Sequence, residues 1–165
     1  MTQKKIWLSR KTVTILTLLL LVIGSGFLWI FIQSQKKIVQ AEQEAIELIS
    51  VDQKIKHVND FQWFTLEEST FSMDFVNHKD QQIYAIIQQE GGDIEYYTLQ
   101  DIISAKDAQA ITASEKKVDY YLNTRLGKIE NIPVWEVIFR DKNEKINYFY
   151  INAKSGEWLQ SIENI

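Results

Sequence analysis

Residues 133–159, PVWEVIFRDKNEKINYFYINAKSGEWL, alternate between two sets of side chains in the way that predicts an antiparallel β-sheet. Two strands flank the polar turn DKNEK, and a third follows AKSG, where Gly156 permits a positive φ. The single proline, Pro133, stands at a strand entry, where a missing N–H is tolerated. The pattern therefore predicts a three-stranded meander.

Both faces of this meander carry apolar side chains, although a sheet covered by one helix needs only one apolar face. In VWEVIF, Trp135, Val137 and Phe139 lie on one face and Val134 and Ile138 on the other. In INYFYI, Tyr148 and Tyr150 lie opposite Phe149 and Ile151. The second face either packs against a neighbouring domain, stays half-exposed as tyrosine commonly does, or binds a partner protein. The candidate partner-binding residues are Trp135, Tyr148, Tyr150 and Trp158.

A helix and a further strand precede the meander. Ser104 and Asp107 have the spacing of an N-cap and its reciprocal carboxylate, and the apolar positions that follow predict a helix to about Lys116. The stretch VDYYLNTRL, residues 118–126, reads as the next strand. Residues 100–165 thus form one predicted α+β domain, a helix packed on an antiparallel sheet.

The same order occurs once more, earlier in the chain. Residues 36–99 contain an amphipathic helix with Ala45 and Leu48 on its apolar face, then the strand patterns FQWFT, STFSMDF, QIYAII and IEYYTL. At a spacing of 64 residues Phe71 matches Trp135 and Gly92 matches Gly156, and the helices match with a slip of one residue. We interpret the two regions as tandem copies of one fold.

The second copy resembles the PepSY pattern, with its W-E-V strand, polar turn, aromatic strand and small-residue turn before an acidic residue. The full order, ending in GEWLQSIEN, resembles the TseB-like regulators of cell-wall elongation in Gram-positive bacteria, most specifically over Pro133–Asn164. The first copy, Ile38–Leu99, matches mainly by order and spacing. The resemblance implies tandem cystatin-like domains without catalytic activity, which act on a penicillin-binding protein outside the cell.

An apolar stretch, Val13–Ile32, precedes both copies and is about 20 residues long, enough for a membrane-spanning helix. A cleaved signal would have a shorter apolar region and a cleavage site, so we expect an uncleaved anchor. Lys4, Lys5, Arg10 and Lys11 precede it, which predicts that residues 1–12 stay in the cytoplasm and that both domains lie outside the cell.

Composition excludes several function classes. Residues 33–165 hold 14 basic and 22 acidic residues, a net charge of −8, which argues against nucleic-acid binding. The absence of cysteine excludes thiol catalysis, and His57 and His78 have no motif around them, so we expect both on the surface. The carboxylate pairs Glu67–Glu68 and Asp141 with Glu144 read as turn residues. We expect neither an enzyme nor a cofactor.

These observations predict a membrane-anchored regulator that acts through protein contact. A protease-inhibitory module is the alternative, because PepSY-type domains also occur in peptidase propeptides. A third hypothesis is a sensor that binds a small ligand between the two copies.

Overall fold

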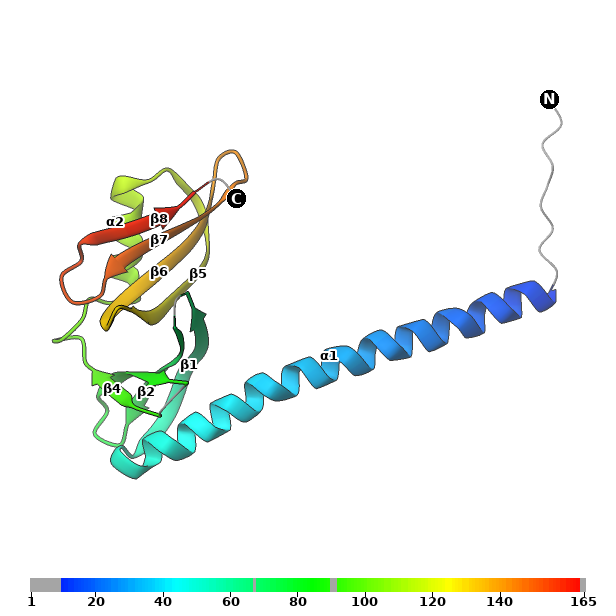
Figure 1. The fold of residues 1–165 in the computed structure, drawn as a ribbon, viewed down its shortest axis with the longest axis horizontal. Coiled ribbons are helices and arrows are strands. Elements are labelled where there is room, and N and C mark those ends of the chain that lie inside the picture. The colour runs from blue at the N-terminus through cyan, green and yellow to red at the C-terminus, as the bar shows by residue number, and fades with distance from the viewer. Residues whose placement is uncertain (1–9, 67, 90–91, 164–165) are drawn as a thin grey trace. The chain divides into compact units, whose positions relative to one another are not determined.

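The computed structural model describes residues 10–66, 68–89 and 92–163, and the chain divides into two compact units, residues 1–44 and 45–165. The protein is α+β, with a long N-terminal helix and two antiparallel sheets of four strands each (Figure 1). Among the residues singled out in the sequence, Lys4, Lys5, Glu67 and Asn164 lie outside the described ranges.

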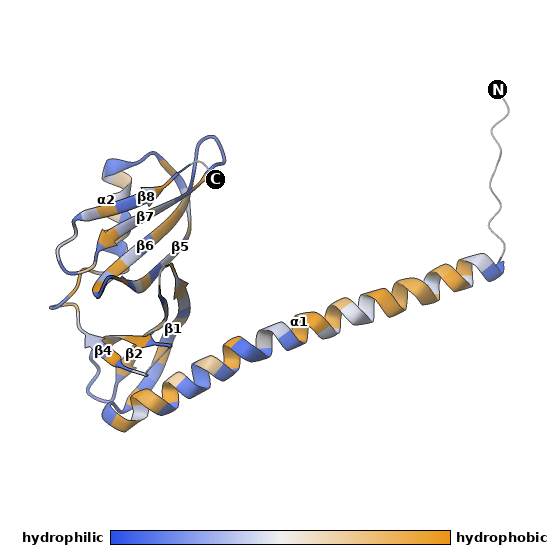
Figure 2. Cartoon of the chain, in the orientation of Figure 1, coloured by the Kyte–Doolittle hydropathy of each residue, from blue (hydrophilic) through white to orange (hydrophobic). Residues whose placement is uncertain are grey.

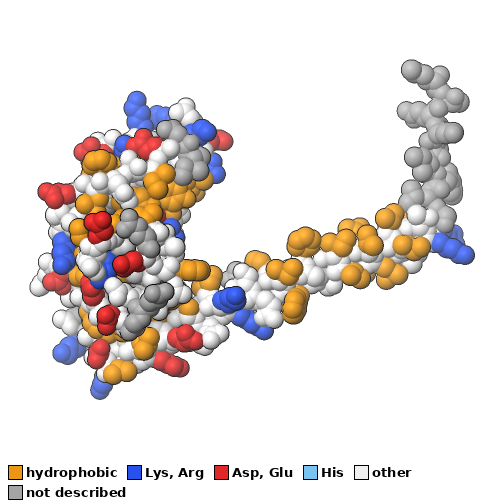
Figure 3. Space-filling view, in the orientation of Figure 1, with side chains coloured by type: hydrophobic (Ala, Val, Ile, Leu, Met, Phe, Trp, Pro, Cys, Tyr) orange, Lys and Arg blue, Asp and Glu red, His pale blue; other side chains and the backbone are white. Residues whose placement is uncertain are grey.

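Helix α1, Arg10–Asp52, contains the apolar stretch. Hydrophobic side chains follow one another along this part of the helix, and none of it is buried (Figures 2 and 3). The hydroxyls of Thr14 and Thr17 donate to the carbonyls four residues earlier, each at 2.9 Å, so neither leaves an unpaired polar group on the apolar surface. Within the described residues, α1 is the one helix long and apolar enough to cross a membrane, which fits an anchor.

The first sheet has the strand order β1-β2-β3-β4, with bounds Ile55–Thr65, Ser69–Asn77, Gln82–Gln88 and Ile94–Tyr97. Its core cluster joins the last turns of α1 to one sheet face through Ala45, Ile49, Met73, Phe75, Ile83, Ala85 and Ile87. Leu48, which we expected on the apolar helix face, is 46% exposed. The buried face is centred on Ala45 and Ile49, one turn apart, and Leu48 is rotated away from it.

Helix α2, Ala105–Glu115, begins at the predicted cap: the Ser104 hydroxyl accepts from the Asp107 N–H, and the Asp107 carboxylate accepts from the Ser104 N–H. The second sheet follows in the order β5-β6-β7-β8, with bounds Val118–Ile129, Ile132–Asp141, Ile146–Asn152 and Trp158–Ile162. Ala108 of α2 belongs to the same core cluster as the predicted apolar face of β6 and β7, namely Trp135, Val137, Phe139, Phe149 and Ile151.

The strand pairing repeats between the two sheets. Phe71 pairs with Ile87 and, 64 residues later, Trp135 pairs with Ile151. The β2–β3 and β6–β7 turns also agree, because Asn77 and Asp141 each accept two backbone N–H bonds from their own turn. Gly92 and Gly156 both have the positive φ that glycine readily adopts, at 71° and 77°. The two sheets are thus copies of one pattern of strand pairing.

Strands β1 and β5 extend beyond the sequence expectation, β1 beginning at Ile55 and β5 reaching Ile129. Two register shifts interrupt β1, between Ile55 and His57 and between Val58 and Asp60. The same two shifts recur 63 residues later in β5. Each shift breaks the two-residue alternation, which hid the first half of β1 from the sequence pattern. In β5 the start at Val118 agrees with the prediction, and only residues 127–129 at its end were missed.

Candidate interaction surface

The four aromatic residues predicted to bind a partner do not form one surface. Trp135 and Tyr150 are buried, at 3% and 2% exposure, Tyr148 is half-buried, and Trp158 is 55% exposed on the edge strand β8. Trp135 lies on the face of β6 that α2 covers, whereas Tyr148 and Tyr150 lie on the opposite face. Of the four, Trp158 therefore offers the most surface to a partner.

Trp135 is held in place from two directions within the unit formed by residues 45–165. Its indole N–H donates to the Ile103 carbonyl at 2.8 Å, in the segment before α2. The Tyr84 ring of the first sheet meets the indole edge-on, with ring centroids 5.7 Å apart. Burial, with the nearby charge of Asp74, raises the pKa of Tyr84 to about 12, so this ring stays neutral at physiological pH.

Part of the opposite face of β6 and β7 is covered by the first sheet. Phe64 of β1 is fully buried and clusters with Val134 and Tyr150. Its ring lies against the backbone of Gly127 in β5, where a Cβ atom would overlap the ring. This contact explains why the second face is apolar: part of it packs against the neighbouring copy, as one of the sequence alternatives proposed.

A buried carboxylate adds a polar connection beside Phe64. Glu136, only 1% exposed, forms an ion pair with Arg125 Nε and accepts a hydrogen bond from the Tyr150 hydroxyl at 2.8 Å. Arg125 also donates from Nη1 to the Trp63 carbonyl of the first sheet at 2.9 Å. Burial and the neighbouring Glu136 raise the pKa of Tyr150. These polar groups satisfy one another, as buried groups must, and their role is structural.

Trp63 is an exposed aromatic residue outside the set predicted to bind a partner. It is 52% exposed, and it packs on Phe71, which in turn stacks on Phe61. The alternation in FQWFT puts Phe61 and Trp63 on the same face of the strand. Alternation does not show which residues of that face other parts of the chain cover.

The space between the two sheets is small. A cavity of about 80 Å³ is lined by polar groups of Asp60, Gln62, Ser72, Asp74 and Arg125, together with Tyr84 and Trp135. Ligand pockets usually measure roughly 300–1,000 Å³, whereas a cavity of this size holds a few water molecules. It has no room for a cell-wall fragment, so the sensor hypothesis finds no site there.

A more open groove of about 400 Å³ follows the segment before α2, lined by Leu99, Asp101, Ile103, Ser104, Asp107 and Lys154. Its two carboxylates serve the backbone: Asp101 accepts from the Thr98 N–H, and Asp107 caps α2. These hydrogen bonds lower the pKa of both groups. The polar lining is therefore part of a turn and a helix cap, with no side chain directed at a ligand.

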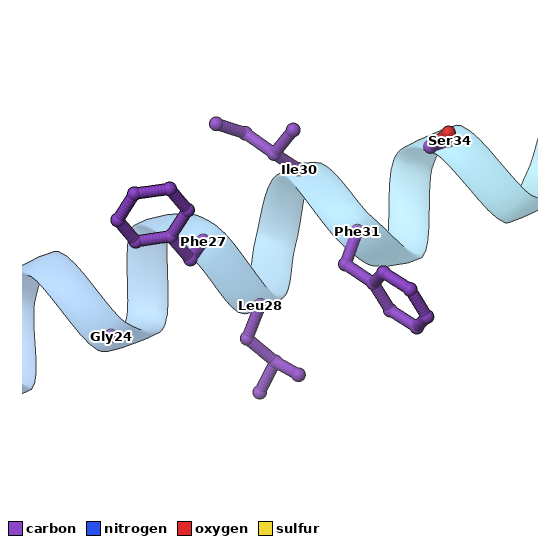
Figure 4. Close-up of a pocket in the computed structure, with 6 residues that line it drawn as sticks. All are labelled: Gly24, Phe27, Leu28, Ile30, Phe31 and Ser34. Carbon is purple, nitrogen blue, oxygen red and sulfur yellow. The ribbon is translucent and has the colours of Figure 1, made fainter. Parts of the chain in front are cut away.

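Helix α1 has a hollow of its own, shown in Figure 4, bounded by Gly24, Phe27, Leu28, Ile30, Phe31 and Ser34. All six belong to one helix, and a Cβ atom added at Gly24 would meet nothing within 4 Å. The hollow is an uncovered part of the helix surface.

The residues weighed for chemistry are separated. His57 and His78 are exposed, as expected, and Asp141 binds the backbone of its own turn. Among residues 10–66, 68–89 and 92–163, no three His, Cys, Asp or Glu side chains come together in a group that could hold a metal ion.

Comparison with known proteins supports the fold. The solved structure of the YpmB protein from Bacillus subtilis is similar to this chain with a TM-score of 0.60 and 21% sequence identity, over 69% of this chain and 90% of that one. No protein-family model matches the sequence, and no curated protein matches it. The similarity to the solved structure therefore identifies a fold that this chain shares, an α+β arrangement already seen by experiment.

Proposed function

We propose that this protein is a membrane-anchored, non-catalytic regulator of peptidoglycan synthesis during cell elongation, which acts by contact with a penicillin-binding protein outside the cell. The observation that carries the proposal is the combination of one unburied, apolar helix with two sheets whose buried polar groups are used for packing. Such a chain has the means to hold a recognition surface at a membrane.

Each half of the proposal has its own support. The net charge of −8 over residues 33–165 disfavours nucleic acid and anionic headgroups as the main ligand and suits recognition of protein. The role in wall elongation rests on the resemblance of Pro133–Asn164 to TseB-like regulators. The repeated strand pairing, with Ala45 and Ala108 buried at equivalent helix positions, supports two PepSY-like copies, each with its helix on its sheet.

Crosslinking of the full-length protein in intact membranes, followed by identification of the adducts, tests the function. We expect a transpeptidase of the wall-elongation machinery among the adducts, because contact with such an enzyme is the proposed mode of action. Adducts that contain no wall-synthesis protein would contradict the proposal.

A further inference from the structure

Because the fold is repeated, the same pair of strand positions occurs once in each sheet, in two different environments. In the first sheet, Phe61, Phe71 and Trp63 form the first-sheet aromatic stack, with ring centroids 5.4 Å apart for the two phenylalanines and 6.1 Å for Trp63 and Phe71. Trp63 lies opposite Phe71 in the pairing of β1 with β2, and it is 52% exposed. A half-exposed tryptophan side chain on the surface of a sheet is a common feature of protein interaction sites.

The equivalent pair in the second sheet is Leu126 opposite Trp135, and both residues are only 3% exposed. Three features cover them: α2 through Ala108, the Tyr84 ring, and the segment that enters α2, in which Ile102 is buried in the same cluster. The Ile103 carbonyl accepts the Trp135 indole N–H at 2.8 Å. The chain itself thus shows what occupies this position: a non-helical segment with aliphatic side chains, one of whose carbonyls accepts the indole N–H.

Within the described residues, the stretch before the first copy's strands has no such non-helical segment at the equivalent position. At the 63-residue spacing that relates Ala45 to Ala108, Ile102 and Ile103 correspond to Val39 and Gln40, which lie inside helix α1. The sequence difference between the two copies therefore puts helix where the second copy has the non-helical covering segment. In the unit formed by residues 45–165, Trp63 of the first-sheet aromatic stack is 52% exposed.

We infer that the first-sheet aromatic stack is a docking site for a non-helical, aliphatic segment of a partner protein. The site is continuous with the contact between the sheets, because the Trp63 carbonyl accepts from Arg125 and the next residue, Phe64, is the buried ring beneath Gly127. A second copy of this chain is a poor occupant for two reasons. Its own Ile102 is already buried, and residues 33–165 of two copies, each with a net charge of −8, repel each other. The partner's identity as a wall-synthesis enzyme rests on the proposed function. The location of the docking site does not depend on it.

The chain supplies its own probe. A synthetic peptide of residues 97–106, YTLQDIISAK, reproduces the covering segment, and its binding to the full-length protein in detergent micelles can be followed by the NMR signals of the indole N–H groups. We expect the Trp63 signal to shift in a saturable way and Trp63→Ala to weaken binding at least about tenfold, as for a tryptophan that dominates an interface.

Trp158→Ala is the matched control, because Trp158 is 55% exposed on the second sheet. It should bind the peptide as the unchanged protein does, and a peptide with Ile102→Asp and Ile103→Asp should not bind. Three results would overturn the inference: no shift up to about 1 mM peptide, equal binding of the aspartate peptide, or a loss of binding with Trp158→Ala that equals the loss with Trp63→Ala.

A second experiment separates the surface from the partner. A photoreactive residue is placed at position 63 or at position 158 of the full-length protein in intact membranes. Adducts with a wall-synthesis enzyme through position 63 support both proposals, and adducts through position 158 alone overturn the docking site while the proposed function stands. Peptide binding at Trp63 without any wall-synthesis adduct supports the docking surface and contradicts the proposed function.

Discussion

Glu136 is a carboxylate placed where water cannot reach it, and its environment gives it a definite energetic role. Arg125 and the Tyr150 hydroxyl share its two oxygens. Removal of one member of a buried ion pair costs about 3–5 kcal/mol, because the other charge is left without a partner. Since the Arg125 side chain is 24% exposed, water can recover part of that cost.

We therefore expect Glu136→Ala to lower the free energy of unfolding by about 3 kcal/mol. Glu136→Gln should cost less, because its amide oxygen still accepts from Tyr150. Urea unfolding of the full chain in detergent, followed by near-ultraviolet circular dichroism, measures both. Glu115→Ala, at an exposed position of α2, is the control, and an equal effect of Glu115→Ala and Glu136→Ala would contradict the prediction.

Gly127 is required by a neighbour on the other sheet. Because glycine has no Cβ atom, its backbone can lie directly against the Phe64 ring. An added Cβ atom would be closer than 3.0 Å to each of the three nearest ring atoms. Overpacking of this kind costs about 1–3 kcal/mol, so Gly127→Ala should destabilise the protein by that amount.

A double-mutant cycle identifies the cause of that loss. In a Phe64→Leu background the smaller side chain leaves space, and the penalty of Gly127→Ala should shrink clearly below its value in the unchanged protein. The free energies of unfolding of the four proteins give the coupling. Additive effects would mean that the contact between Gly127 and Phe64 is not the source of the loss.

At the scale of elements, an ion pair joins β4 to β5. Lys128 of β5 is 4% exposed and pairs with Glu95 of β4, which is 41% exposed. Burial alone would raise the pKa of Glu95, but hydrogen bonds from Lys128 and Tyr97 outweigh it and hold that pKa below its ordinary value of 4.5. A carboxylate whose pKa is lower in the folded state stabilises the fold above its unfolded pKa, and this stabilisation is lost as the pH falls.

Glu95→Gln should therefore lower stability at pH 7, and the difference from the unchanged protein should close as the pH falls from about 4.5 through the lower folded pKa. Urea midpoints measured at pH 7, 5 and 3 follow this convergence. Because Glu95 is partly exposed, solvent screens the pair and the effect is smaller than for Glu136. A difference that stays constant with pH would show that the charge of Glu95 is not responsible.

The start of α2 is a second element-scale feature. Ser104 and Asp107 satisfy each other's backbone N–H groups. Ser104→Ala should cost about 1 kcal/mol, the usual value of an N-cap, in urea unfolding. Ser104→Asn keeps a cap acceptor and should lose less, so equal losses for the two variants would argue against capping as the mechanism.

At the scale of the whole molecule, the absence of cysteine allows a direct test of membrane topology. We expect a single cysteine introduced as Ser155→Cys, at an exposed turn position, to react with a membrane-impermeant maleimide in intact cells. A Thr2→Cys variant should react only after the cells are made permeable, because the basic tail is expected in the cytoplasm. The reverse pattern of labelling would overturn the proposed orientation.

Much of the fold follows from local patterns in the sequence. The apolar stretch within α1, the capping pair of α2, the turns with Gly92 and Gly156, and the 64-residue repeat all depend on residues close together in the chain or on a fixed period. Where register shifts broke the period in the first half of β1, the strand was predicted too short.

Which aromatic residues lie on the surface does not follow from such local patterns. Trp135, Tyr150 and Trp63 are all aromatic residues on alternating strands, and only the packing of the two sheets separates the buried from the exposed ones. Phe64 covers Tyr150, and Tyr84 with the segment before α2 covers Trp135, across separations in the chain that no local period records. The sequence by itself determined the elements, their order and their repetition, because these depend on short-range alternation and turn chemistry. The tertiary structure alone decided that Trp135 is core and Trp63 is surface, because burial depends on which distant residues fill the space beside each ring.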